Sequence, residues 1–300
     1  MVSQEFPGAG LAEPALAKIN LSLRVLGRRA DGYHLIESLV CFADLGERLT
    51  ARIADEVDLK VSGPMATDLG AGGNLVLAAD SAFRQSFAQT PPLAYALDKH
   101  IPVAAGLGGG SADAAAALRL LAGLVGIPAD DPEVARMALD IGADVPVCLG
   151  SRPAWVSGIG ERLRPAQALP ELSLVLVNPR IAVATGEVFG ALAISPGEKT
   201  VSEGKSAIDT GGIEQLVIEA RNDLEDAARR LVPDIAGVID AIATQPGCRA
   251  ARMSGSGATC FGVFAEGAAA EQAAGTIAAT RPDWWVKAAR SGALMPAASV

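Results

Sequence analysis

A glycine-rich segment near the middle of the chain, residues 102–112, has the composition of a phosphate-binding loop. It consists of Pro102, Val103, Ala104, Ala105, Gly106, Leu107, Gly108, Gly109, Gly110, Ser111 and Ala112. Glycine lets the backbone approach an anion closely, and the free amides of a following helix point at that anion. An apolar run ending at Ile101 precedes the segment, and an alanine-rich run over residues 114–124 follows it. Strand, loop and helix in this order favour a triphosphate cradle over a flexible glycine linker.

The loop departs from the two commonest phosphate-binding patterns. Gly110 is followed by Ser-Ala-Asp, so the P-loop lysine is absent, and the last glycine of the dinucleotide fingerprint is absent as well. In a chain of net charge -9, an anionic ligand must therefore be attracted by local groups: a helix N-terminus, a placed Lys or Arg, or a metal ion. We expect Ser111 at the N-cap of the helix and Asp113 in its first turn, where the helix dipole favours an acid. A metal ligand on the phosphates is the second role open to Ser111.

A strand near the N-terminus can supply the missing cation. Residues 15–25 alternate between apolar and polar side chains, which predicts a strand with one buried face. Lys18 and Asn20 then project the same way, about 6 to 7 Å apart. At this point an ordinary solvated strand edge remains an equal alternative.

Two further segments carry groups suited to chemistry. Asp144 follows a predicted helix, residues 132–141, and precedes an expected apolar strand; a partly buried carboxylate needs a partner, and Lys18 is a candidate. The alternative is a helix cap without chemistry. The turn Asp31-Gly32 delivers Tyr33 and His34, which could present a flat surface to a planar ligand or merely close a hairpin.

Composition limits the class of protein. The chain has 300 residues, is 50% hydrophobic and carries a net charge of -9, which suits a compact enzyme and argues against nucleic-acid or membrane-surface binding. Four widely spaced cysteines and two histidines support neither a disulfide framework nor a zinc site. Residues 1–10 lack the features of a signal peptide, so we expect a cytoplasmic protein.

The order of expected elements indicates an α+β fold in two layers. The expected strands are 15–25, 35–42, 93–101, 172–177, a strand ending at 252, 259–264 and 285–289, with hairpins over 49–61 and 154–163. The expected helices are 74–87, 114–124, 132–141, one capped by Thr185, 221–243 and 268–279. We place a domain boundary near residue 160, giving domains 1–160 and 161–300. The first dozen residues are expected to be a tail, and the polar segment 195–212 a mobile loop.

Three of these segments together resemble the motifs of the GHMP kinases. Residues 102–112 are similar to their phosphate-binding motif, 142–146 to the segment with the catalytic acid, and 253–258 to a glycine loop near the C-terminus. Residues 17–21 and 31–34 resemble more specifically the branch that acts on a cytidine-diphosphate-linked methylerythritol. The resemblance runs from about Ala15 to the end and includes Thr185 and residues 222–223. One departure is Ala112, where the family usually has a second serine.

The resemblance implies a fold and an activity. The fold would combine an N-terminal domain like domain 2 of ribosomal protein S5 with a ferredoxin-like α/β-plait C-terminal domain. The activity would be ATP- and Mg²⁺-dependent phosphorylation of the tertiary 2-hydroxyl of that cytidylyl substrate, in the non-mevalonate route to isoprenoid precursors. The protein would be a monomer or weak homodimer. Another GHMP kinase, of mevalonate or homoserine type, and a nucleotide-binding protein without catalysis are the alternatives.

The resemblance also assigns roles to residues. Asp144 would be the general base, and Lys18 would pair with it and help to neutralise the transferring phosphoryl group. Residues 102–112 would hold the ATP phosphates, Ser111 the metal, and Asn74 would lie near the adenine. For the second substrate, Tyr33 would stack on the cytosine, His34 would bond its edge, and Asn20 and Thr185 would contact the sugar-phosphate part. Asp31 belongs to the same substrate-binding turn.

Overall fold

A computed structural model describes residues 10–69, 73–167, 169–200 and 213–292 of the chain. Its strands are β1 (Leu11–Asn20), β2 (Arg24–Arg28), β3 (His34–Ile53), β4 (Asp58–Ser62), β5 (Leu93–Asp98), β6 (Ala154–Gly158), β7 (Arg162–Pro165), β8 (Ser173–Asn178), β9 (Cys248–Met253), β10 (Cys260–Phe264) and β11 (Trp285–Gly292). Its helices are the 3-10 turn η1 (Ala66–Asp68) and the α-helices α1 (Leu75–Ser86), α2 (Gly109–Val125), α3 (Pro132–Ile141), α4 (Val145–Gly150), α5 (Thr185–Gly190), α6 (Ile213–Glu219), α7 (Glu225–Leu231), α8 (Asp234–Ala243) and α9 (Gly267–Thr280). The predicted α+β class is confirmed.

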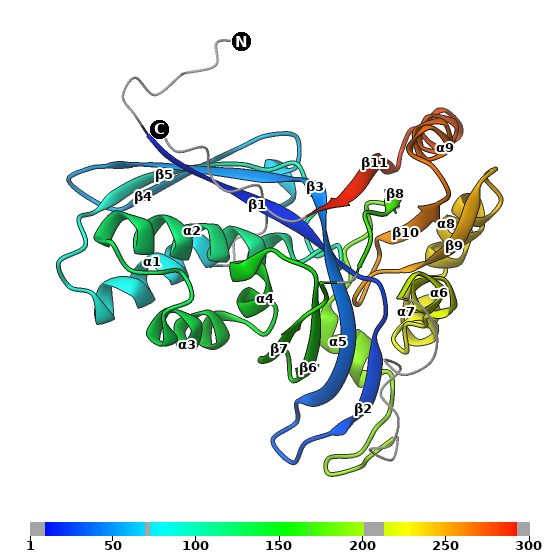
Figure 1. Ribbon diagram of the computed structural model, residues 1–300, viewed down its shortest axis with the longest axis horizontal. Coiled ribbons are helices and arrows are strands. Elements are labelled where there is room, and N and C mark those ends of the chain that lie inside the picture. The colour runs from blue at the N-terminus through cyan, green and yellow to red at the C-terminus, as the bar shows by residue number, and fades with distance from the viewer. Residues whose placement is uncertain (1–9, 70–72, 168, 201–212, 293–300) are drawn as a thin grey trace.

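The long strand β3 organises the sheet. It spans 20 residues and pairs antiparallel with β1, β2, β5, β6 and β11. The main path through the sheet runs β4-β5-β3-β11-β8-β10-β9. Helices α1 to α4 lie together beside β1, β3 and β5, while α6 to α9 gather around β8 to β10 (Figure 1). The short pairing of β11 with β3 joins these two groups.

Three buried apolar clusters fill the interior. One lies among the N-terminal strands and α1 to α4, and another among the C-terminal strands and α7 to α9. A third cluster joins them, because it contains Ile19 and Leu39 from β1 and β3 together with Leu174, Phe261 and Trp285 from the second half. The boundary near residue 160 remains a prediction, and this third cluster draws on both sides of it.

The expected hairpin over residues 49–61 is wrong. Strand β5 pairs antiparallel with β3 and parallel with β4, so it lies between the two strands that we expected to be neighbours. Burial explains the arrangement. Leu93, Tyr95 and Leu97 of β5 are buried, whereas Asp58 and Lys60 of β4 are exposed, which suits β4 to the sheet edge.

Other expected elements are broken or shifted, in two cases at prolines. The helix expected over 221–243 divides into α7 and α8 at Pro233, since proline lacks an amide hydrogen and clashes with the preceding turn. The segment after Asp144 is helix α4 rather than a strand, with Pro146 in the first turn, where proline is tolerated. The strand expected over 15–25 is divided between β1 and β2.

The N-terminal tail and the polar loop are only partly described. The tail was expected to include the first dozen residues, but β1 already begins at Leu11, and residues 1–9 lie outside the described part of the chain. Within the polar segment, residues 201–212 lie outside it too. Residues 195–200 run along β2, where Gly197 and Thr200 donate backbone hydrogen bonds to Arg28 and Leu26. In the described ranges, no helix has the length and apolarity to cross a membrane.

Candidate active site

The glycine-rich loop is held from both sides by segments distant in sequence. The Lys18 amide of β1 donates to the Leu107 carbonyl at 2.8 Å. From the second half of the chain, the Thr259 amide donates to the Ala105 carbonyl at 3.1 Å, and Ser254 Oγ donates to the Gly106 carbonyl at 3.0 Å. The loop therefore has one position relative to β1 and to the small-residue segment 253–258.

Two glycines of the loop are required by backbone conformation and space. Gly106 and Gly108 have φ values of 73° and 65°, in the left-handed region that other residues avoid. A Cβ on Gly106 would lie 2.4 Å from the Ser254 carbonyl oxygen, and one on Gly108 would lie 3.1 Å from Lys18 Cε. Lys18 thus passes directly against the loop.

The helix that follows the loop begins earlier than expected. Gly108 is the N-cap residue of α2 and provides no side-chain cap. Ser111 is therefore the third residue of the helix, so its expected N-cap position is wrong. Because no side chain caps α2, the amides of its first turn are available to an anion, as a phosphate cradle requires.

Next to the loop, the side chains of Lys18, Asn20 and Asp144 contact one another. Lys18 Nζ donates to Asp144 Oδ2 at 2.9 Å and to Asn20 Oδ1 at 2.7 Å. The Lys18 side chain is 4% exposed and that of Asp144 is 45% exposed, so the ammonium is buried and the carboxylate faces open space. The Asn20 amide nitrogen donates to Ser38 Oγ at 2.8 Å, which fixes its oxygen toward Lys18. The predicted pairing and the shared face are confirmed.

These groups line a cavity of about 620 Å³, within the size range of small-molecule sites. The cavity brings together most of the residues predicted for the site: Lys18, Asn20, Tyr33, His34, Ala104, Ala105, Gly106, Gly108, Gly109, Gly110, Ser111, Asp144 and Thr185. Pro102, Leu107 and Ala112 are buried instead. Asp31 does not line the cavity; it pairs with Arg29 at 2.6 Å and accepts the Tyr33 amide at 3.3 Å, which shapes the turn.

One end of the cavity forms an aromatic slot. The His34 ring packs on Phe189 of α5 with 4.8 Å between ring centroids, and Tyr33, which is 58% exposed, lies beside them. His34 Nε2 is buried and has no hydrogen-bond partner among the described residues. Burial, and then the nearby Arg28 guanidinium, lower the pKa of His34, so the ring is neutral near pH 7. A neutral ring edge without a partner can bond a polar planar ligand.

Sequence reasoning missed several residues of this cavity. Phe189, Arg28 and Ser256 all line it, and Ser256 Oγ lies 2.9 Å from the Thr185 hydroxyl. Thr185 is the first residue of α5 and not its cap. Phe189 could have been found from its spacing, because it lies one helical turn after Thr185 and so shares a helix face with it.

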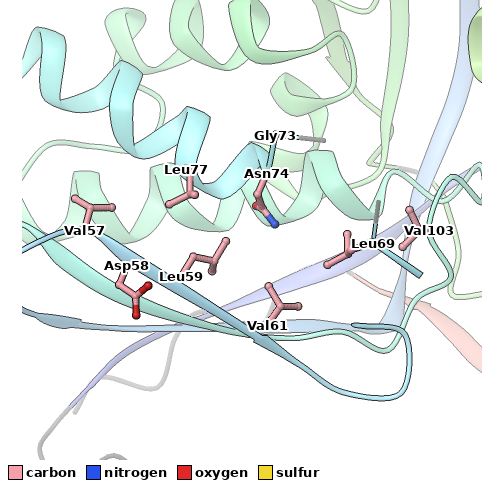
Figure 2. A pocket seen from close by; sticks show the side chains of 9 residues that line it. All are labelled: Val57, Asp58, Leu59, Val61, Leu69, Gly73, Asn74, Leu77 and Val103. Carbon is pink, nitrogen blue, oxygen red and sulfur yellow. The ribbon is translucent and has the colours of Figure 1, made fainter. Parts of the chain in front are cut away.

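A second cavity, of about 550 Å³, is lined by residues of β4, α1 and the glycine-rich loop. Apolar side chains of β4 and α1, such as Leu59 and Leu77, face each other across it, and Asn74 lies beside them (Figure 2). Val103 of the glycine-rich loop lines the same cavity. Asn74 Oδ1 accepts the Val76 amide at 2.9 Å, which confirms the expected helix cap. The loop thus lines both this apolar cavity and the larger cavity, which holds the charged side chains of Lys18 and Asp144.

Few groups near the loop could ligate a metal ion. In the described residues, no three His, Cys, Asp or Glu side chains gather as a metal site. The Ser111 hydroxyl and the Asp144 carboxylate are oxygen groups near the loop, and both line the larger cavity. This sparse set fits Mg²⁺, which keeps several waters and binds mainly through nucleotide phosphates.

Two family models and several known proteins match this chain. Residues 74–152 match the family described as GHMP kinases N terminal domain, and residues 206–282 match GHMP kinases C terminal. The chain is 47% identical to a protein of Rhodopseudomonas palustris over 94% of its own length and 98% of that protein. It is 46% identical to one of Parvibaculum lavamentivorans over 94% and 98%. Both are named 4-diphosphocytidyl-2-C-methyl-D-erythritol kinase.

Solved structures share the fold. A crystal structure of 4-(cytidine 5'-diphospho)-2C-methyl-D-erythritol kinase has a TM-score of 0.76 and 32% identity, covering 95% of this chain and 100% of that one. Homoserine kinase from Cytophaga hutchinsonii has a TM-score of 0.70 at 17% identity, covering 98% of each chain. The match to homoserine kinase, at 17% identity, shows only that the two chains share a fold.

The loop geometry predicts a contrast between two glycine substitutions. We expect Gly106→Ala to weaken ATP binding at least tenfold, because its Cβ overlaps the Ser254 carbonyl and its backbone strain alone is about 1 to 2 kcal/mol. Gly123→Ala, within α2 and with no atom within 4 Å of the added Cβ, is the matched control and should bind ATP normally. Titration calorimetry measures both, and equal affinities would contradict the assignment of the loop.

Proposed function

The chain belongs to the GHMP kinase family, and we propose that it transfers the γ-phosphoryl group of ATP to the 2-hydroxyl of 4-diphosphocytidyl-2-C-methyl-D-erythritol. ADP and the 2-phosphate are the products. One observation carries the proposal: the Lys18–Asp144 ion pair lies under an anion cradle, in a cavity that ends in an aromatic slot. The names of the relatives that match nearly the whole chain support the same substrate.

The chemistry follows from the positions of Lys18 and Asp144. Phosphoryl transfer needs an acceptor oxygen in line with the γ-phosphate, a group to take its proton, and positive charge near the phosphoryl oxygens. Asp144 accepts the proton of the substrate hydroxyl, since its carboxylate is open to the cavity. Lys18, 2.9 Å away, orients that carboxylate and offsets charge on the transferring group. The amides at the start of α2 hold the remaining phosphates.

The aromatic slot suits the cytidine part of the substrate. Tyr33 and Phe189 supply aromatic faces for stacking, and the unpartnered Nε2 of His34 bonds the edge of the cytosine ring. Asn20 and Thr185 line the same cavity as the slot and the loop, and they would contact the sugar-phosphate part. Asp31 acts indirectly by shaping the turn that carries Tyr33.

The apolar cavity suits the adenosine of ATP, with Asn74 beside the base. Ser111 would hold Mg²⁺ together with the phosphates, and the ion would supply positive charge that stabilises the phosphates during transfer. Ala112, at the position of the usual second serine, is 2% exposed and packs in the N-terminal core. Its missing hydroxyl leaves the backbone cradle intact.

A comparison of acceptors tests the proposal. In an assay that couples ADP release to a reporter, we expect turnover with the cytidylyl substrate and at most background rates with mevalonate or homoserine. Those two acceptors have no base to occupy the aromatic slot. Preferred turnover of either would favour the second candidate, another GHMP kinase. ATP binding without any turnover would favour a protein that binds nucleotide but has lost catalysis.

Substituting the proposed base should separate binding from catalysis. We expect Asp144→Asn to bind ATP with little change and to lower kcat by about 10²-fold or more, because the amide cannot accept the hydroxyl proton. Asp140→Asn is the control, since Asp140 lies on α3 and its side chain is 64% exposed. Steady-state kinetics measures both. A kcat within a few-fold of wild type for Asp144→Asn would remove Asp144 from the role of base.

The slot predicts a pH dependence for substrate binding. Because the pKa of His34 is lowered by burial and by Arg28, KM for the cytidylyl substrate should be flat near pH 7 and rise only in more acidic solution, as His34 gains a proton. Arg28→Gln removes the charge but keeps hydrogen-bonding groups for the Gly32 and Ile194 carbonyls. We expect it to move the rise in KM to higher pH. An unmoved profile would show that His34 does not titrate in this step.

A further inference from the structure

A second group of charged side chains lies beneath the start of α2, outside both cavities. Lys99 after β5, Glu47 of β3 and Asp113 of α2 are each 3% exposed. Lys99 Nζ lies 2.6 Å from both carboxyl oxygens of Glu47 and 2.9 Å from Asp113 Oδ2. We call these three residues the buried charge cluster. The phosphoryl-transfer chemistry described above uses none of them.

The cluster lies next to the glycine-rich loop. Just before the loop, the Ile101 amide donates to Glu47 Oε1 at 3.4 Å. Within the loop, a Cβ on Gly109, the first residue of α2, would lie 3.8 Å from the same oxygen. Asp113 lies one turn further along α2. A change in the charge or position of these side chains would therefore move the α2 amides that form the anion cradle.

The charges of the cluster do not balance if both acids are ionised. One ammonium would face two carboxylates, and a net charge in the protein interior is costly. Asp113 Oδ1 is buried and has no hydrogen-bond partner among the described residues, although buried carboxylate oxygens normally have donors. Lys99 Nζ contacts both carboxyl groups, which brings the Glu47 and Asp113 carboxyls close to each other. A proton on Glu47 would cancel the excess negative charge and would give Asp113 Oδ1 a hydrogen-bond donor.

We propose that Glu47 is the uncharged member of the cluster, donating its proton to Asp113 Oδ1, and that the cluster thereby positions the start of α2 for binding the triphosphate. Lys99 then pairs with a single carboxylate, that of Asp113. Glu47 and Lys99 are positioning residues in this account. The role in triphosphate binding rests on the proposed function, whereas the charge assignment does not.

The surroundings of Glu47 support this charge state. Burial, and then the neighbouring Asp113 carboxylate, raise the pKa of Glu47 to about 9, against the opposing effect of Lys99. Burial lowers the pKa of Lys99, but Asp113 and Glu47 raise it by more, so the ammonium stays charged. Across the β1–β3 pair, Glu47 faces the uncharged Ala15. Lys99 and Asp113 are thus the charged groups that face it.

This charge state fixes the direction in which the free energy of unfolding changes with pH. In the unfolded chain Glu47 loses its proton near pH 4.5, and in the folded protein near pH 9. Between these values folding takes up a proton, so the free energy of unfolding falls as the pH rises. Glutamine cannot ionise, and its amide group can donate to the same Asp113 oxygen. Glu47→Gln should therefore abolish this fall.

Thermal unfolding of the full chain without nucleotide, from pH 5 to pH 9, tests the charge assignment. We expect Glu47→Gln to match wild type near pH 5 and to exceed its Tm by a growing margin toward pH 9. Asp113→Asn should show a smaller fall in Tm from pH 5 to pH 9 than wild type, because Glu47 without the Asp113 carboxylate beside it can ionise and pair with Lys99. A Glu47→Gln variant equal to or less stable than wild type at pH 8 to 9 would overturn the assignment.

The positioning role is tested by the Kd for ATP over the same range of pH. Wild type should bind ATP progressively more weakly as the pH passes 9, where ionised Glu47 repels Asp113, and Glu47→Gln should not. At pH 7.5, Glu47→Ala should weaken ATP binding and Glu47→Gln should retain it, which a purely structural role would not produce. Identical pH profiles for wild type and Glu47→Gln would overturn the positioning role. If wild type binds no ATP, the proposed function fails while the Tm comparison still decides the charge assignment.

Discussion

The buried ammonium of Lys18 is the constraint on which the arrangement of the site depends. Removing such a charge from water costs several kcal/mol unless polar groups surround it, and here Asp144 Oδ2 and Asn20 Oδ1 lie 2.9 Å and 2.7 Å away. The backbone amide of the same residue bonds the glycine-rich loop at Leu107. One residue of β1 thus fixes both the carboxylate and the loop, which explains how a loop without its own lysine can serve phosphoryl transfer.

The second half of the chain completes this arrangement from the opposite side. Ser254 Oγ accepts a hydrogen bond from the backbone N–H of Asn20 at 3.1 Å and donates one to the Gly106 carbonyl. Asn222 in turn donates to the carbonyls of Met253 and Gly255, which supports the segment that carries Ser254. Helix α5 adds Thr185 and Phe189 to the larger cavity. The loop, the ion pair and the aromatic slot therefore all require contacts between the two halves.

The sequence was most informative where local chemistry decides structure. The alternation around Lys18 and Asn20 predicted their shared face, and Asn74 predicted a helix start, because strand period and helix capping act over a few residues. Long-range order was not predictable in this way: the insertion of β5 between β3 and β4 depends on which strand carries the more apolar buried face, and the partners of that face are distant in sequence. The buried charge cluster also escaped prediction, since its residues come from three separate parts of the chain and meet only after folding.

The cooperation of Lys18 and Asp144 is the central claim, and a double-mutant cycle tests it most directly. It compares kcat for wild type, Lys18→Met, Asp144→Asn and the double variant with the cytidylyl substrate. If the two groups act as one unit, the double variant should be about as slow as the slower single variant, because removing either residue already disables the pair. Losses that multiply in the double variant would contradict the account, since they would mean that the two residues act independently.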